Sequence, residues 1–365
     1  MNPRRLVLVG IAAVLALGAV IALGFLLFGK KTAALELNEI PIAPGQDFRV
    51  DGEVITYTTA DAFYEYRTDK RRSPLTTTPL SAPISGYDIR ADNMAVFSGS
   101  VLQIRGQEEV TLTGTIHQVR CGDSHVAVLR RNAQSGADSI VAFDSQGNMT
   151  ADVIDYSDGK VVNFGFYTEG GNERLWVIAV AVQQGQPVFN VKMHNPDAGG
   201  MTIGYLPSFY TQAIEQVHFT ADSIFVVGTQ ELVRYSIGNP RERYRVNIYG
   251  QRVLDMAISD AGVSFLLQPR QESFSQTVRV LTVSEAETSS ESLVSLHIPS
   301  EVRAAFLQSG SLYVFTETEM FGYNYAGRST VTLELPEAPE RVRRIGADHM
   351  LFETLDASYL ASVTA

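Results

Sequence analysis

The sequence has one cysteine and one tryptophan in 365 residues, and both scarcities limit what the protein can be. A lone cysteine forms no internal disulfide, so the fold must depend on a hydrophobic core, and we expect Cys121 to be a small buried residue. Hydrophobic residues make up 45% of the chain and charged residues 19%. These ordinary values exclude disordered and collagen-like chains.

Motifs that hold metals or carry out catalysis are also missing. The six histidines stand apart, without a His-x-x-x-His or Cys-x-x-Cys pair, so no zinc site is predicted. The sequence has no nucleophile elbow, no phosphate-binding P-loop and no regular calcium loop. We therefore predict no catalytic, cofactor-binding or metal-binding residue, and we favour a protein that is not an enzyme.

A few polar residues near predicted turns leave the alternative open. Asp and Gly are common turn formers, and a strand histidine is usually a core residue, but turns of a closed ring can converge on one face and form a ring of carboxylates. The residues concerned are Asp222, Asp255, Asp260 and Asp348, with His218 and His349 nearby.

Positive charge is scarce, with 29 Lys and Arg against 40 Asp and Glu and a formal net charge of −11. Binding of nucleic acid by counterion release requires a cationic face, so we predict no nucleic-acid partner. The local basic runs are short and interrupted, and we interpret them as solvated loops. They are Lys70–Arg72, Arg241/Arg243/Arg245 and Arg341/Arg343/Arg344.

One long apolar run is present, the 23 uncharged residues Leu6–Phe28, which follow Arg4 and Arg5 and precede Lys30 and Lys31. A helix of that length spans roughly 34 Å at ~1.5 Å per residue, enough to cross a bilayer. A cleavable signal peptide would have a shorter apolar stretch and a small-x-small cleavage site. We therefore predict an uncleaved transmembrane signal-anchor helix at 6–28.

The orientation of this anchor is predicted from the chain segments on its two sides. The cations on its two sides nearly balance, so charge alone does not orient it. Residues 1–5 are too few to fold, so we expect a short cytoplasmic tail and a folded domain outside the cytoplasm. The protein would then be a single-pass cell-membrane protein whose first partner is the lipid bilayer, through residues 6–28.

After a linker at 29–47, the chain becomes a series of short β-rich runs separated by turn residues, without a long amphipathic helix. Groups of four such runs recur; the clearest are Ala213–Gly250 and Val302–Pro336. Eight starts, near residues 48, 87, 117, 161, 213, 252, 302 and 341, have a mean spacing of about 42 residues. This period is typical of a β-propeller, so we predict an all-β, eight-bladed ring over 48–365, with seven blades as the alternative.

The last repeat, from Arg341, has three strands and stops at the chain end. The strand-like segment 33–42, with apolar Leu35, Leu37 and Ile40, is otherwise unassigned. We predict that it supplies the missing fourth strand, because a ring closed in this way leaves no unpaired edge between its first and last blades.

Two short motifs resemble known propeller repeats. The hairpin Val141–Asn148, with its Asp-x-x-Gly turn, resembles quinoprotein-like repeats, and Tyr325–Arg328 echoes it. Such propellers include quinone-dependent dehydrogenases and scaffold lipoproteins without a cofactor. The enzymes' regular docking tryptophans are absent, since Trp176 stands in a different strand. Cys121–His125 resembles the Cys-Gly-x-x-His turn of chromosome-condensation-regulator repeats, where the motif occurs in most blades.

As a whole, the chain resembles uncharacterised bacterial membrane-anchored propellers of unknown function, with quinoprotein-like and WD40-like repeat character. The resemblance implies a non-enzymatic, extracytoplasmic scaffold that binds an envelope protein or a glycan and needs no cofactor. The alternatives are an extracytoplasmic hydrolase or quinoprotein-like oxidoreductase, and a ligand sensor. We interpret 161–208 and 268–299 as insertion-bearing stretches available for contacts, and Ser284–Ser292 as an exposed loop.

Overall fold

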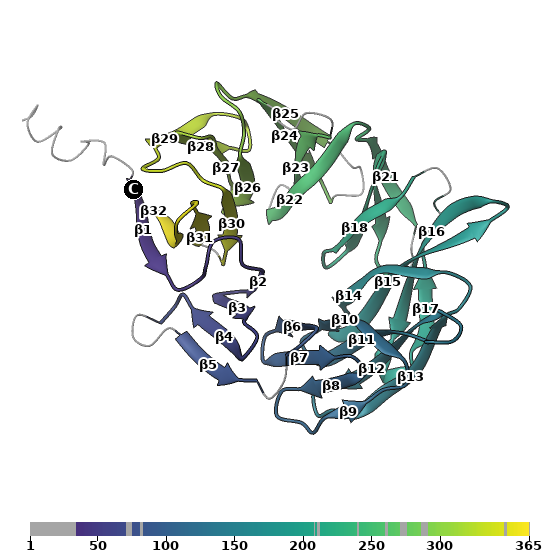
Figure 1. Cartoon of the computed structure of the whole chain (residues 1–365). Coiled ribbons are helices and arrows are strands. Elements are labelled where there is room, and N and C mark those ends of the chain that lie inside the picture. Colours follow the sequence, from purple (N-terminus) through teal and green to yellow (C-terminus); the bar gives the residue numbers. More distant parts are fainter. Residues whose placement is uncertain are drawn as a thin grey trace, which may run out of the picture.

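The computed structural model describes residues 34–70, 75–80, 83–207, 209, 212–238, 241–259, 262–270, 276–285, 291–346 and 349–364. These residues form eight four-stranded antiparallel sheets and one short 3-10 helix, η1 (Pro196–Ala198). Figure 1 shows the sheets as blades around a central opening. The prediction of an eight-bladed all-β propeller is therefore confirmed, and the seven-bladed alternative is wrong.

In blades 1 to 7, the four strands follow one another in sequence from the centre of the ring outward, and blade 8 takes its outermost strand from the other end of the chain. Blade 1 is β2 (Phe48–Asp51), β3 (Val54–Thr58), β4 (Ala62–Arg67) and β5 (Leu75–Pro79), and blade 2 is β6 (Gly86–Arg90), β7 (Asn93–Ser98), β8 (Val101–Ile104) and β9 (Val110–Thr111). Blade 3 is β10 (Thr115–Cys121), β11 (His125–Arg131), β12 (Asp138–Asp144) and β13 (Met149–Tyr156), and blade 4 is β14 (Lys160–Glu169), β15 (Asn172–Gln183), β16 (Gln186–Asn195) and β17 (Met201–Tyr205).

The second half of the ring repeats this order. Blade 5 is β18 (Ile214–Phe219), β19 (Ser223–Gly228), β20 (Glu231–Ser236) and β21 (Glu242–Asn247), and blade 6 is β22 (Gln251–Ser259), β23 (Gly262–Pro269), β24 (Thr277–Val283) and β25 (Glu291–His297). Blade 7 is β26 (Ala304–Gln308), β27 (Ser311–Phe315), β28 (Glu319–Asn324) and β29 (Ser329–Glu334), and blade 8 is β30 (Arg341–Ile345), β31 (His349–Glu353), β32 (Ser358–Thr364) and β1 (Ala34–Ile40).

Burial along each blade explains why its sequence changes from strand to strand. The second strand lies inside the ring and is apolar on both faces, as in β19, where all six residues are buried. The outermost strand alternates between exposed and half-buried residues, as in β21 with its sequence ERYRVN. The eight first strands begin within two residues of the predicted starts.

The hydrophobic core is divided among the junctions between blades. Between blades 2 and 3, for example, Phe97 and Leu102 pack in one cluster with Val119 and Val126. Equivalent clusters join blades 3 and 4, 4 and 5, 5 and 6, 6 and 7, 7 and 8, and 8 and 1. Each fully buried aliphatic or aromatic side chain contributes about 1.5–3 kcal/mol, so blade-to-blade contact stabilises the ring.

Blade 8 joins the two ends of the described chain. β1 pairs with β32 in antiparallel register from Ala34 opposite Thr364 to Ile40 opposite Ser358. Leu35 and Leu37 pack against the cluster between blades 7 and 8, and Ile40 is buried in the cluster between blades 8 and 1. Within the predicted segment 33–42, residues 34–40 therefore form the fourth strand of the last blade, and Ile40 contacts the first blade's cluster.

Strand direction gives the ring two distinct faces. Neighbouring strands in a blade are antiparallel, so the first and third strands begin, and the second and fourth strands end, on the same side. We call this side the start face and the other side the end face. β2 begins at Phe48 on the start face, whereas β1, a fourth strand, begins at Ala34 on the end face.

One sequence prediction lies outside the described residues, and two others differ from the structure. The predicted anchor, residues 6–28 with its flanking cations, lies outside the described residues; within the part of the chain that is described, no helix is long and apolar enough to cross a membrane. The stretch 161–208 contains no separate insertion, because its extra length goes into the long strands β15 and β16. Residues 291 and 292 begin β25, so the predicted loop 284–292 extends too far.

Candidate functional site

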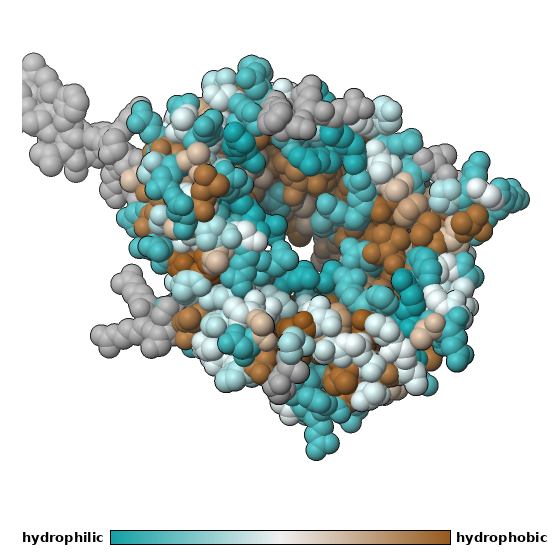
Figure 2. All heavy atoms as spheres, in the orientation of Figure 1, coloured by the Kyte–Doolittle hydropathy of each residue, from teal (hydrophilic) through white to brown (hydrophobic). Residues whose placement is uncertain are grey.

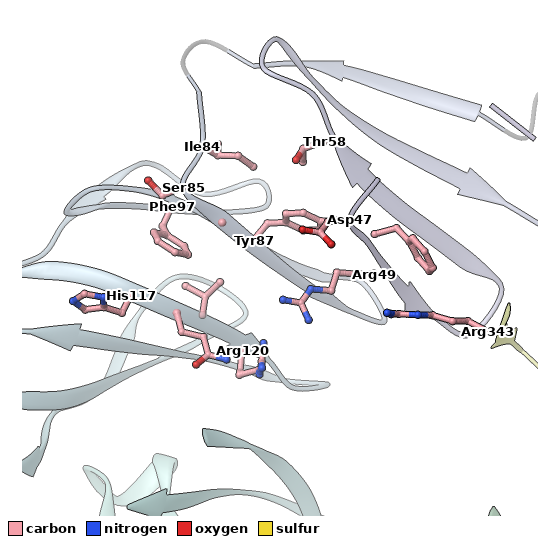
Figure 3. A pocket seen from close by; sticks show the side chains of 14 residues that line it. Asp47, Arg49, Thr58, Ile84, Ser85, Tyr87, Phe97, His117, Arg120 and Arg343 are labelled. Atoms are coloured by element: carbon pink, nitrogen blue, oxygen red, sulfur yellow. The ribbon is translucent and has the colours of Figure 1, made fainter. Parts of the chain in front are cut away.

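Two cavities open on the start face between the innermost strands. The first, of about 490 Å³, lies among blades 1, 2, 3 and 8, and Figure 3 shows it from close by. The second, of about 510 Å³, lies among blades 6, 7 and 8, and Arg343 lines both. Figure 2 shows mostly hydrophilic residues around the central opening. We call the two cavities together the arginine mouth.

The arginine mouth has an unusual charge for so acidic a chain. Its lining includes six arginines and two carboxylates, although the whole chain carries a formal charge of −11. The arginines are Arg49, Arg120, Arg252, Arg303, Arg343 and Arg344, and the carboxylates are Asp47 and Asp255.

In the first cavity, the two outer arginines are open to solvent. Arg49 is the second residue of β2 and Arg343 the third residue of β30, and both are exposed. Within the described ranges, no carboxylate lies within 4 Å of either guanidinium. The Arg343 guanidinium lies 5.3 Å from the centre of the Phe48 ring, which Arg341 also contacts at 4.7 Å. The ring therefore positions Arg343 without neutralising it.

Arg120 lies deeper, near the end of β10, and its side chain is 23% exposed. Its nearest carboxylate oxygen, Oδ1 of Asp88, is 4.0 Å away. Burial lowers the pKa of Arg120, but an arginine remains charged throughout the physiological range. Figure 3 shows Arg49 and Arg343 reaching into the opening from one side and Arg120 from another.

In the second cavity, the cations other than the shared Arg343 have partners, and Arg303 lies 3.9 Å from Glu301. Arg252 donates to the Gln268 side chain at 2.7 Å. Arg344 donates to the Leu307 carbonyl at 2.9 Å and lies 3.7 Å from Asp255. These bonds hold the guanidiniums within the wall, so the first cavity offers the freer cations of the arginine mouth.

The remaining walls of the first cavity are rigid. The Tyr87 hydroxyl donates to the Thr56 carbonyl at 2.8 Å, and burial raises the pKa of Tyr87, so this phenol stays neutral. Gly86 faces the ring of Phe97, where a Cβ would come within 2.7 Å of a ring carbon. A fixed wall with outward-pointing guanidiniums can bind carboxylate or phosphate oxygens, often through paired hydrogen bonds.

The end face has a different character. A cavity of about 520 Å³ there is lined by three aspartates (Asp51, Asp88, Asp123) and two arginines (Arg90, Arg120). The charges pair locally: Arg90 lies 2.7 Å from Asp123, and Asp51 accepts from the Ala91 backbone. This arrangement leaves little charge for a ligand.

A buried carboxylate joins blades 3 and 4 on the end face. Glu173, 8% exposed, accepts from the backbone N–H groups of Asp123 and Ser124, from the Ser124 hydroxyl and from Nδ1 of His125. Nε2 of His125 lies 3.0 Å from Asp197. Although burial opposes charge on both groups, these bonds raise the pKa of His125 and lower that of Glu173.

Ser124, His125 and Glu173 are the residue types of a hydrolase triad, but their geometry is wrong for one. In a triad, the serine and the carboxylate bond to different ring nitrogens. Here Ser124 and Glu173 both bond to Nδ1, and His125 is only 4% exposed. The cluster is a structural bridge between two blades.

The aspartates singled out in the sequence separate into different environments. Asp255 accepts from the Leu307 backbone N–H of the next blade at 2.8 Å, and Asp88 does the same for Cys121. Asp222 is exposed in the turn between β18 and β19. Asp260 and Asp348 lie outside the described residues. In the described ranges, no group of three or more His, Cys, Asp or Glu could hold a metal.

The histidines and the cysteine have structural contacts. His218 bonds to Gln216 at 2.9 Å, and burial lowers its pKa to about 4. His349 begins β31, 3.6 Å from Glu53. Cys121 is buried, as expected, and burial raises the pKa of its thiol. A buried thiol with a raised pKa is a poor nucleophile.

Sequence reasoning missed the arginine mouth. The sequence predicts solvated loops at 241–245 and 341–344, but Arg243 and Arg245 lie in β21 and the second run lies in β30. Arg343 and Arg344 line the second cavity. A signal was present: Arg49 and Arg252 each follow the first residue of an innermost strand. Equivalent positions in a propeller face the same opening, so their charges add.

Comparisons with known proteins agree on the fold. Searches of protein-family models and of curated proteins gave no match. Among solved structures, the chain is similar to BamB from Moraxella catarrhalis, with a TM-score of 0.56 and 10% identity over 89% of this chain and 99% of that one. The chain therefore has the β-propeller fold of this structure.

Two eukaryotic propellers are similar to the same degree. The WD40 domain of SCAP from fission yeast gives a TM-score of 0.57 at 9% identity, and Saccharomyces cerevisiae Sqt1 gives 0.55 at 7% identity. Each match covers 90% of this chain and 98% of the other. The fold is thus similar to that of a WD40 domain, and at these identities the likeness concerns the fold alone.

Proposed function

We propose that this chain is a non-enzymatic binding scaffold that holds an acidic segment of a partner protein in its arginine mouth. The observation that carries the proposal is a pair of exposed arginines, Arg49 and Arg343, which have no carboxylate partner among the described residues of an otherwise acidic chain. Arg120 extends the same positive lining inward.

The energetics favour an anionic ligand with several carboxylates. A single exposed ion pair contributes only about 0–1 kcal/mol, so one acidic residue would bind weakly. Several arginines converging on one cavity can engage several carboxylates together, with paired hydrogen bonds from each guanidinium. Such binding should weaken as salt screens the charges, since the Debye length falls from ~10 Å at 0.1 M to ~3 Å at 1 M.

The rest of the surface favours a protein over other anions. A nucleic acid would bring a long polyanion against a chain of net charge −11, and most of that contact would be repulsive. A short acidic segment places its charge only in the mouth. A neutral glycan would leave the arginines without a partner.

We further propose, from the length and composition of the apolar run alone, that residues 6–28 anchor the ring in a cell membrane with the propeller outside the cytoplasm. In that case the chain would reach the ring at Ala34, on the end face. The arginine mouth would then point away from the bilayer, toward other envelope proteins. Protease added to intact cells should digest the propeller; complete protection would reverse this topology.

Binding of a labelled peptide of twelve glutamates, followed by fluorescence anisotropy, tests the acidic-segment proposal. We expect binding at 50 mM salt that weakens at least tenfold in the Arg49→Glu/Arg343→Glu variant and declines at 200 mM salt. The matched control is Arg328→Glu, which reverses an exposed charge in the β28–β29 turn on the end face. Equal affinity in the double variant, or no binding by the wild-type chain, would overturn the proposal.

A further inference from the structure

The most exposed large apolar side chains gather on the same face as the arginine mouth. Among the described residues, four such side chains are more than 70% exposed: Leu355 at 79%, Val182 and Tyr249 at 75%, and Tyr205 at 73%. Such exposure of single residues is ordinary, so what matters for a docking surface is that these four share one face.

The direction of the neighbouring strands shows on which face each of these four residues lies. Val182 is next to the end of β15, a second strand, and Tyr205 ends β17, a fourth strand. Tyr249 lies in the connection from β21 to β22, and Leu355 in the connection from β31 to β32. Second and fourth strands end on the start face, so all four residues lie there.

These residues are distributed over several blades of the start face. Val182 and Tyr205 belong to blade 4, Tyr249 follows blade 5, and Leu355 belongs to blade 8. In a ring of eight, blades 4 and 8 lie across the channel from each other. Figure 1 shows the β15–β16 hairpin, which carries Val182, extending beyond its neighbours. We call Val182, Tyr205, Tyr249 and Leu355 the apolar rim.

We propose that the start face docks a folded, acidic partner protein across the channel, with apolar pockets of the partner receiving the apolar rim. This inference rests on the proposed function, because charge complementarity with the arginine mouth is what identifies the partner as acidic. Tyrosine and arginine are enriched in the interface residues that contribute most to affinity.

The composition of the rim agrees with a docking role. Tyr205 and Tyr249 each present a large ring with few rotatable bonds, so burying them costs little conformational entropy. Stable interfaces cover about 800 Å² on each partner, which requires contact with several blades rather than one cavity. The mouth would supply charge selectivity and the rim most of the apolar contact.

Site-specific photocrosslinking in the native cells tests this docking. The full chain carries p-benzoylphenylalanine at Tyr205, Tyr249 or Leu355, with Met201 and Ile258 as matched controls, because both are exposed apolar residues near the end face. We expect the three rim positions to give adducts with one and the same acidic protein, identified by mass spectrometry, and the controls to give none. Adducts of equal yield at the controls, or no adduct at the rim, would overturn the proposal.

Repeating the crosslinking in the Arg49→Glu/Arg343→Glu background separates the two proposals. We expect the rim adducts to decrease at least fivefold. Unchanged adducts would support docking on the start face while contradicting the acidic segment in the mouth. Conversely, glutamate-peptide binding that depends on the arginines, without any rim adduct, would support the proposed function and contradict the docking of a folded partner.

Discussion

The two faces of the ring differ in whether their charged side chains have partners. On the end face, Glu173 and His125 are buried between blades, and each charge has several partners. On the start face, Arg49 and Arg343 are exposed and have no carboxylate within 4 Å among the described residues. Charges with partners stabilise the fold, whereas charges without partners remain available for a ligand. We therefore assign stability to the end face and binding to the start face.

The largest effect that this comparison predicts concerns Glu173→Ala. The substitution removes the acceptor of the buried His125 ring and of three partly buried donors on Asp123 and Ser124, so we expect a loss of about 3–5 kcal/mol in the free energy of unfolding. The matched start-face variant Arg343→Ala removes one exposed cation–π contact and should cost less than about 1 kcal/mol. Urea denaturation measures both. Similar losses of unfolding free energy in the two variants would contradict the assignment of stability to the end face.

A smaller loss is expected for Asp255→Ala. Its carboxylate accepts the Leu307 backbone N–H across the junction of blades 6 and 7, a charge-assisted bond whose removal should cost about 1–3 kcal/mol. Asp222→Ala is the control, because that aspartate is exposed in a turn and should change stability by less than about 0.5 kcal/mol. Urea denaturation gives the free energy of unfolding of both variants. An equal loss in Asp255→Ala and Asp222→Ala would argue against a structural role for Asp255.

We expect a smaller loss of stability when the ring-closing strand β1 loses the side chain of Leu37. Its half-buried side chain packs in the cluster between blades 7 and 8, so Leu37→Ala should cost about 1–2 kcal/mol, less than a fully buried leucine. Leu293, on the outermost strand of blade 6, is 55% exposed, and Leu293→Ala should cost less than about 0.5 kcal/mol. A neutral Leu37→Ala, seen as an unchanged urea midpoint, would mean that closure does not depend on this contact.

The smallest effect is a pH dependence at the end face. Because Glu173 and Asp197 raise the pKa of His125, the folded protein retains a proton that the unfolded chain releases as pH rises above about 6.5. The stabilisation is complete below that pH and is lost as pH rises through the folded pKa, with a slope of at most about 1.4 kcal/mol per pH unit. The stability advantage of the wild type over His125→Gln should therefore be larger at pH 6 than at pH 9. A constant or reversed difference would contradict the paired arrangement.

Much of the fold could be predicted from the sequence because it depends on local patterns. Each repeat contains a strongly apolar second strand such as 223–228 between turn residues, and this spacing located all eight blades. The incomplete last repeat indicated that another segment must pair with β32, and Leu35 and Leu37 supplied the apolar alternation of a strand. The spacing of the repeats and the number of strands in the last one were sufficient to predict the blades and the ring closure.

The candidate site could not be predicted in the same way, because its residues are far apart in the sequence and come together only in the folded ring. Arg49 and Arg343 are almost 300 residues apart, and their shared cavity depends on the position of each within its innermost strand. The Glu173 and His125 pair joins residues 48 positions apart in different blades, through a bond that no motif marks. Single cations and carboxylates in a sequence do not show which of them will have partners.

The central claim is that ligand binding belongs to the start face, and hydrogen–deuterium exchange with the twelve-glutamate peptide tests it most directly. We predict slower exchange in the peptide's presence at 47–49, 117–120 and 341–344, and no change at 122–125 and 173–175. Protection confined to the second set of segments would place the ligand on the end face and contradict the account.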